Sequence, residues 1–92
     1  MIKSNPLFAR LNEESGLFIV YVKTLTGIYN SFVCSKSSTV DDLKLKVQEL
    51  EGFPPEQQRF IYAGGQLEEG QKLVDYHIKN GHIIHLVIRL NK

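Results

Sequence analysis

Three features of this 92-residue sequence contain residues that could take part in catalysis or in binding a metal ion or a phosphate. Cys34 with a histidine could form a nucleophile and base pair, in which the imidazole takes the thiol proton. His82 and His85 could bind a metal ion, because imidazole nitrogens are common metal ligands. Gly64-Gly65 is the one stretch to weigh as a phosphate-binding loop. Each would require further residues around it.

Those further residues are missing in each case. Cys34 lies within an apolar alternation that predicts an inward side chain, and no activating pattern surrounds it. His82 and His85 are three positions apart on one expected strand, which sends them to opposite faces. Gly64-Gly65 reads as a hairpin turn and lacks the lysine and hydroxyl of a phosphate loop. We therefore expect no catalysis, no metal and no cofactor.

Composition restricts the partners further. The 11 Lys and Arg residues nearly balance the 10 Asp and Glu residues, and neither sign runs in blocks. This pattern argues against binding to nucleic acid or to an anionic membrane. The single Cys34 cannot form an internal disulfide and indicates a reducing compartment, so we expect an intracellular protein of the cytoplasm or nucleus. No segment resembles a signal peptide or a membrane span, and we expect a monomer.

The first 17 residues differ in character from the rest. They are largely polar, and Asn5-Pro6 disfavours a helix before that point. Leu7, Phe8 and Leu11 could form the apolar face of a short helix, or the segment could be a fraying tail. We expect residues 1–17 to be a flexible extension and residues 18–92 to be one domain.

The domain is expected to contain up to five strands and one substantial helix. Period-two patterns predict strands over residues 18–23, 28–34, 57–62, near 66–67 and over 83–90. Thr39 and Asp42 predict a capped helix over about 39–51 that ends at Gly52. Its apolar stripe is Val40, Leu43, Val47 and Leu50. The order ββαβββ indicates an α+β fold with the helix on one side of the sheet.

The strands expected over residues 18–23 and 83–90 carry apolar residues on both faces. One helix can cover only one face of a small sheet. Apolar surface therefore stays exposed in the monomer, which indicates a binding module.

Several motifs in this order resemble ubiquitin. They are Val22–Gly27, Glu51–Arg59, Asp75-Tyr76 and His85–Leu90. The similarity runs without a gap from about Phe18 to Lys92. It implies the β-grasp fold of the ubiquitin family, in which a mixed sheet of four to five strands clasps one helix.

The resemblance also implies binding residues. Leu25, Ile61 and Val87 match the family's principal hydrophobic patch, with Arg59, Gly64 and His85 around it. Phe53, Ile88 and Leu90 match a second apolar patch, and Ile19, Tyr21 and Tyr29 fall on a third surface. Asp75 and Tyr76 match a loop surface that some zinc-finger receptors bind. Alternatively, Asp75 is an acid that orders the turn before Ile78.

Strand alternation supports this placement of the patch. Phe60 and Tyr62 are expected on one side of their strand, and Ile61, without Arg59, on the other. In the last strand, His85 and Val87 are likewise expected opposite Leu86 and its inward neighbours. Ile61 and Val87 can thus lie on the face that the helix leaves uncovered.

The chain departs from ubiquitin after Leu90. Asn91-Lys92 stands where the family has the approach to its terminal Gly-Gly, so we expect no conjugation at this point. Lys23, Lys44 and Lys46 match chain-forming lysines, whereas Ile28, Leu50, Gly65 and Asn80 replace the others. We expect Lys44 to be mainly structural and the domain to be a poor chain subunit.

We therefore predict a non-conjugated ubiquitin-like interaction domain within a larger protein. Its expected partners are ubiquitin-binding domains or helices, proteasome receptor subunits, or ubiquitin-pathway enzymes. One alternative is a covalent modifier whose processed C-terminus lies beyond Lys92. The other is a scaffold module private to its parent protein, binding through Ile19, Tyr21 and Tyr29.

Overall fold

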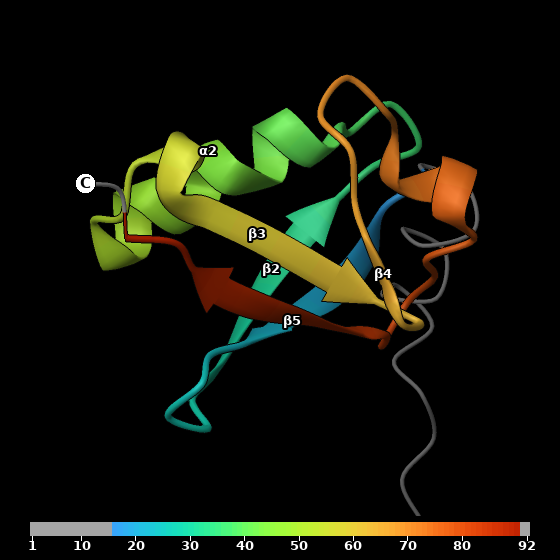
Figure 1. Ribbon diagram of the computed structural model, residues 1–92. Helices are drawn as coiled ribbons and strands as arrows, with labels where there is room; N and C mark the ends of the chain where they lie inside the picture. The colour runs from blue at the N-terminus through green and yellow to red at the C-terminus, as the bar shows by residue number, and fades with distance from the viewer. Residues whose placement is uncertain (1–15, 91–92) are drawn as a thin grey trace, which may run out of the picture.

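The computed structural model describes residues 16–90 of the chain. These residues form a five-stranded mixed sheet with one α-helix across a single face (Figure 1). The elements are β1 (Phe18–Lys23), β2 (Tyr29–Cys34), α2 (Val40–Glu51), η1 (Pro55–Gln57), β3 (Gln58–Tyr62), β4 (Gly65–Gln66), η2 (Leu73–Tyr76) and β5 (Ile83–Ile88). This arrangement confirms the predicted α+β, β-grasp architecture. The predicted extension lies outside the described residues up to position 15, so the domain boundary at 17/18 stays a prediction.

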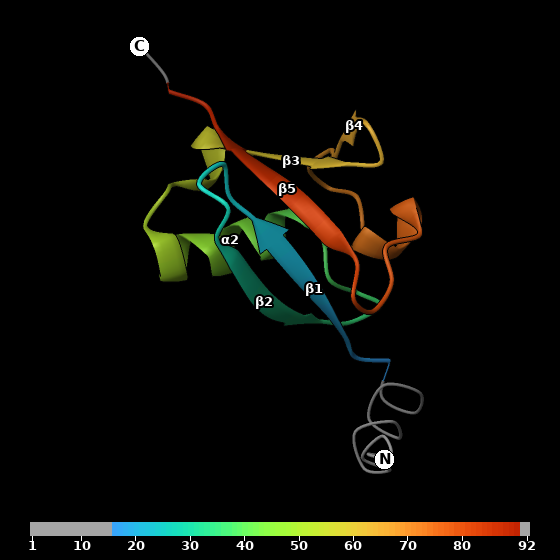
Figure 2. The same ribbon diagram turned by 90° about the horizontal axis from the view of Figure 1, so that it is seen from below.

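The strands lie in the order β2-β1-β5-β3-β4. β1 pairs antiparallel with β2 and parallel with β5, and β3 pairs antiparallel with both β5 and β4. Figure 2 looks onto the outer face of the sheet, with α2 behind it and with β1 and β5 side by side. The first and last strands are therefore neighbours in the middle of the sheet.

Helix α2 begins and ends where its capping residues predicted. Thr39 Oγ1 accepts a hydrogen bond from the Asp42 backbone N–H at 3.1 Å, and Asp42 Oδ2 accepts one from the Thr39 N–H at 3.0 Å. Gly52 has φ +88° and donates its N–H to the Gln48 carbonyl at 2.8 Å. Only glycine adopts this left-handed conformation without strain, so the helix stops there.

The inner face of the sheet packs against α2 to form the core. The core consists of Phe18, Val20, Val22, Cys34, Val40, Leu43, Val47, Phe60, Leu67, Leu73, Ile78, Ile84 and Leu86. Leu50 was predicted on the helix stripe but is 58% exposed, because the last turn of α2 extends beyond the buried part of the sheet. The last strand is also shorter than predicted and ends at Ile88. No helix within residues 16–90 is long and apolar enough to cross a bilayer.

Candidate functional site

The predicted patch residues of the strands, Ile61 and Val87, lie on the outer face of the sheet, opposite α2. The β3–β5 pairing places Ile61 beside His85 and Arg59 beside Val87. Phe60, between the two β3 residues, points inward and is fully buried. Ile61 and Val87 are therefore diagonal neighbours on one surface, each about half-buried, and within side-chain reach of each other.

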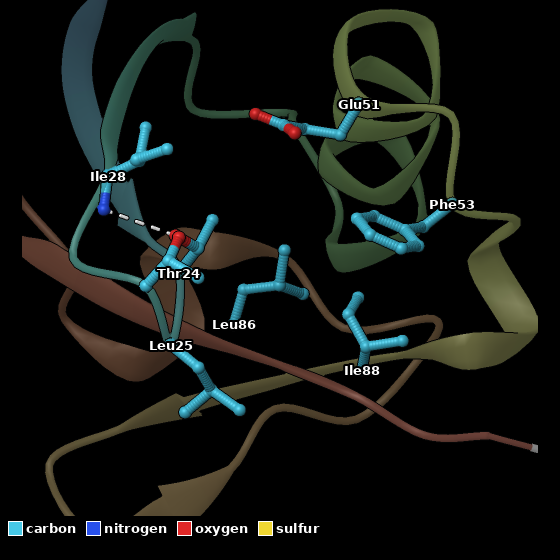
Figure 3. Close-up of a pocket in the computed structure, with 8 residues that line it drawn as sticks. Thr24, Leu25, Ile28, Glu51, Phe53, Leu86 and Ile88 are labelled. Carbon is cyan, nitrogen blue, oxygen red and sulfur yellow. Dashed lines mark hydrogen bonds between the residues drawn. The ribbon is translucent and has the colours of Figure 1, made fainter.

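Leu25 extends from the turn between β1 and β2 and is 81% exposed (Figure 3). Thr24 Oγ1 accepts a hydrogen bond from the Ile28 backbone N–H at 3.2 Å and bonds to Thr26 Oγ1 at 2.9 Å. Gly27, at φ +87°, supplies the left-handed residue that closes the turn. These bonds hold the turn, and most of the Leu25 side chain stays exposed to solvent.

Arg59 shares the outer face with Ile61, which makes the sequence prediction that separated them wrong. Side chains two positions apart on a strand point the same way. Arg59 Nη1 donates to Gln66 Oε1 at 3.3 Å, and Gln66 pairs with Ile61 across β3 and β4. A guanidinium thus lies at the rim of the apolar patch.

Gly64 lies at the tip of the β3–β4 hairpin. Ala63 and Gly64 have φ angles of +53° and +82°, which are the two left-handed residues of a type I′ turn. A Cβ built at Gly64 would meet nothing within 4 Å, so backbone conformation and not space favours glycine here. The turn borders the patch beyond Ile61.

The charge of this face has one sign. The five strands of the described sheet contain no Asp or Glu, and their charged residues are Lys23 and Arg59. Lys23 pairs with His85 across β1 and β5, and its Nζ lies 5.3 Å from the centroid of the Tyr29 ring. The patch is therefore bordered by cationic and imidazole groups, an arrangement that favours a partner carrying carboxylates.

A second apolar site lies at the edge of the patch. It is a groove of about 180 Å³ between the β1–β2 turn and the end of α2 (Figure 3). Its lining consists of Thr24, Leu25, Thr26, Ile28, Glu51, Phe53, Leu86 and Ile88. The groove brings the predicted secondary residues Phe53 and Ile88 together with Leu25 of the patch. Leu90, the third member of that set, lies beyond β5 and is 80% exposed.

Gln58 holds the groove region against the sheet. This buried side chain donates from Nε2 to the carbonyls of Lys44 and Phe53, both at 2.9 Å. Lys44 is itself 5% exposed, and its Nζ forms an ion pair with Glu69 Oε2 at 3.0 Å. These contacts agree with the structural role expected for Lys44.

The residues considered for catalysis and metal binding are buried or contact neighbouring side chains. Cys34 is 2% exposed, and burial raises the pKa of its thiol, which stays protonated at neutral pH and is a poor nucleophile. His82 precedes β5, whereas it was predicted to lie on that strand. Its ring stacks on Tyr62 with centroids 5.7 Å apart, and its Nδ1 lies 2.6 Å from Tyr62 Oη. Among residues 16–90, no group of three His, Cys, Asp or Glu side chains is arranged to hold a metal ion.

The sequence model of the ubiquitin family matches residues 20–91 of this chain. The matched range runs from within β1 to beyond β5, so it includes the whole helix and the patch strands. The chain belongs to the ubiquitin family. The resemblance expected from the sequence motifs is thereby confirmed for this ubiquitin-like domain.

Its relatives occur in two settings. Ubiquitin-like protein 1 of Schizosaccharomyces pombe is 40% identical over 72 residues, which cover 78% of this chain and 92% of that protein. NEDD8-like protein RUB1 of Saccharomyces cerevisiae is 42% identical over 72 residues, covering 78% of this chain and 94% of that protein. E3 ubiquitin-protein ligase UHRF1 of Danio rerio is 36% identical over 72 residues, which are 9% of its length. The domain thus resembles both nearly whole proteins and a small part of a larger one.

The structure exposes two apolar residues that were not among the predicted binding residues. Val33 and Ile83 are 53% and 40% exposed, and both face outward beside the predicted third surface of Ile19, Tyr21 and Tyr29. The alternation of Ile83 with Ile84 contained a signal for this exposure. The pairing of Ile83 with Tyr21 could not be seen before the strands were placed.

Proposed function

We propose that this ubiquitin-like domain is a non-covalent recruitment module that acts within a larger protein. Its patch of Leu25, Ile61 and Val87 binds amphipathic helices of ubiquitin-binding domains, proteasome receptor subunits or ubiquitin-pathway enzymes. The observation that carries the proposal is an outward apolar patch, on strands without a single carboxylate, bordered by Arg59 and His85.

An amphipathic helix can span this surface. The patch members come from β3, β5 and one turn, so a partner has to cross several elements. The apolar face of an amphipathic helix does this with residues spaced three and four apart. Acidic residues on its flanks would meet the guanidinium and imidazole at the rim.

The size of the patch sets the expected affinity. Three apolar anchors with a polar rim form an interface smaller than about 1,000 Å². We expect dissociation constants from about micromolar to sub-millimolar. Such binding is reversible, as recruitment requires.

An NMR titration tests the proposal. The ¹⁵N-labelled domain is titrated with a synthetic ubiquitin-interacting helix, and wild type is compared with Ile61→Ala. We expect shifts clustered at Leu25, Ile61, His85 and Val87. Ile61→Ala should weaken binding by about 1 to 2 kcal/mol, which is about 5- to 30-fold in Kd.

Leu45→Ala is the matched control for this titration. Leu45 is an aliphatic residue that is 52% exposed, and it lies on α2, on the other side of the sheet. Its replacement should leave the Kd unchanged. A well-folded wild-type domain that shows no shifts, or equal weakening by both substitutions, would contradict the proposal.

A second candidate is a covalent modifier. The near full-length similarity to NEDD8-like proteins favours it. Against it, Asn91-Lys92 follows Leu90 where the family's tail leads into its terminal Gly-Gly. Glycine is required there because the tail threads a narrow enzyme channel, which a lysine side chain would obstruct.

Mass spectrometry of the native protein separates the two candidates. The endogenous protein is purified under denaturing conditions and digested, and branched peptides joined through an acceptor lysine are sought. The recruitment proposal expects none. Branched peptides carrying the C-terminal residues of this chain would establish the modifier instead.

A further inference from the structure

The outer face carries a second exposed apolar surface next to the patch. It consists of Ile19, Tyr21, Tyr29, Val33 and Ile83, here named the hairpin surface. Tyr21 and Ile83 are 37% and 40% exposed, and Tyr29 and Val33 are 51% and 53% exposed. So many large apolar side chains on one exposed face indicate a binding surface.

Strand register makes this surface continuous. Ile19 lies opposite Val33 across β1 and β2, and Tyr21 lies opposite Ile83 across β1 and β5. Directly opposed side chains on one face are within contact distance. The surface therefore spans three strands.

We propose that the chain's own N-terminal segment, through Leu7, Phe8 and Leu11, docks on the hairpin surface. These three residues lie outside the described part of the chain, and their spacing is that of one apolar face of a helical turn. The inference goes beyond the recruitment function, because it concerns what covers a different surface.

The length of the connection permits this docking. Eight peptide steps separate Leu11 from Ile19, which allows a reach of about 26 to 29 Å. Six residues of β1 extend over only about 20 Å. Gly16, with φ +75°, lies two residues before β1 and allows the chain to reverse direction there.

Charge at the junction is complementary. Glu13 and Glu14 come just before Gly16 in the sequence. The Lys36 side chain lies along Gly16, with Cγ and Cε 3.4 Å from the position of a Cβ, and Lys79 lines the same groove. Two carboxylates therefore lie within three residues, in sequence, of a position bordered by two ammonium groups, and opposite charges can meet at the end of β1.

Tethering allows a small contact to be populated. A short flexible connection provides an effective concentration of the order of millimolar, which a free peptide rarely reaches. The docked segment would cover Ile83, which neighbours the patch residue His85 along β5.

The test is performed by NMR on the full chain, without any partner. We expect nuclear Overhauser contacts from the Phe8 ring to the methyl groups of Val33 and Ile83. The double substitution Leu7→Ser with Phe8→Ser should abolish these contacts and shift the amides of the hairpin surface. Ile2→Ser, an apolar loss in the same segment, is the control and should leave those amides unchanged.

Three results would overturn the proposal. The first is identical hairpin-surface spectra for wild type and the double variant. The second is contacts from Phe8 to Val74 and Ile78, which line the groove near Gly16. The third is hairpin-surface shifts that grow with protein concentration, because they would show a second copy on the surface. Since no partner is added, failure here is distinguishable from failure of the recruitment proposal.

Discussion

Ile83 and Ile84 are consecutive residues of β5 in opposite environments. Ile84 is fully buried between the sheet and α2, whereas Ile83 is 40% exposed on the outer face. The same contrast separates Phe60 from Ile61 and Val22 from Tyr21. Both faces of the sheet are apolar, but only one has a helix across it.

Residue type therefore does not determine the role of a side chain in this sheet. Inner residues stabilise the fold, because burial removes their apolar area from water. Outer residues of the same types contribute little to folding and leave apolar area available to a partner. Substitutions that separate stability from binding test this division.

The largest expected effect comes from the paired isoleucines. Ile84→Ala should lower the free energy of unfolding by about 2 to 5 kcal/mol, because it leaves a cavity in a packed core. Ile83→Ala should lower it by less than about 1 kcal/mol. Urea unfolding followed by circular dichroism measures both. Equal losses would end the distinction between the two faces.

Gln58 is a polar residue on the inner face of the sheet, and its substitution tests whether that face also depends on hydrogen bonds. Gln58→Leu should cost about 1 to 3 kcal/mol of stability, because the carbonyls of Lys44 and Phe53 lose their buried donor. Gln48→Leu, on the exposed side of α2, is the control and should stay within about 0.5 kcal/mol of wild type. Chemical unfolding of both variants checks this, and a neutral Gln58→Leu would show that its hydrogen bonds contribute little.

Thr39 tests the helix that makes the two faces different. Thr39→Ala removes the Oγ1 that accepts from the Asp42 backbone N–H and should lower the free energy of unfolding by about 1 kcal/mol. Thr39→Ser retains the hydroxyl and should recover most of that loss. Thermal and urea unfolding measure both variants. Equal stability of the alanine and serine variants would mean that the cap is not the cause.

Cys34 gives the smallest predicted effect, and it depends on pH. Burial raises the pKa of the folded thiol, so the unfolded chain loses this proton at lower pH than the folded chain. The stability contribution of the protonated thiol is complete below the unfolded pKa of about 8.5 and is lost as pH rises toward the folded value. The free energy of unfolding should therefore decrease as the pH rises above the unfolded thiol value of about 8.5. Cys34→Ala should reduce this slope, and an unchanged slope would exclude the thiol as its source.

Much of the fold could be predicted because its signals are local. The helix cap at Thr39 and the stop at Gly52 depend on side chains and backbone angles within one turn. The predicted end of the helix stripe at Leu50 was wrong, because exposure there depends on how far the sheet extends beneath α2. The helical spacing of apolar residues contains no information on how far the sheet extends.

The candidate site was predicted in its members but not in all of its geometry. Leu25, Ile61 and Val87 were found through the resemblance, and strand alternation placed the last two on the uncovered face. Arg59 was predicted on the opposite face from Ile61, which was wrong, because residues two apart on a strand share a face. The pairing of β3 with β5 places Arg59 beside Val87 on that face. The role of these residues in binding stays a prediction that the titration tests.

The strands, the helix limits and the turns could be predicted from the sequence, because periodicity, caps and glycines act over a few residues, and the matched motifs indicated the family. Which outward side chains meet depends on the tertiary structure. Tyr21 lies beside Ile83 and Lys23 beside His85 through the parallel pairing of β1 with β5, across most of the domain's length. Such register arises from packing against the shared core, and a slip of one residue would turn every side chain to the other face. The hairpin surface therefore exists only once the first and last strands are joined.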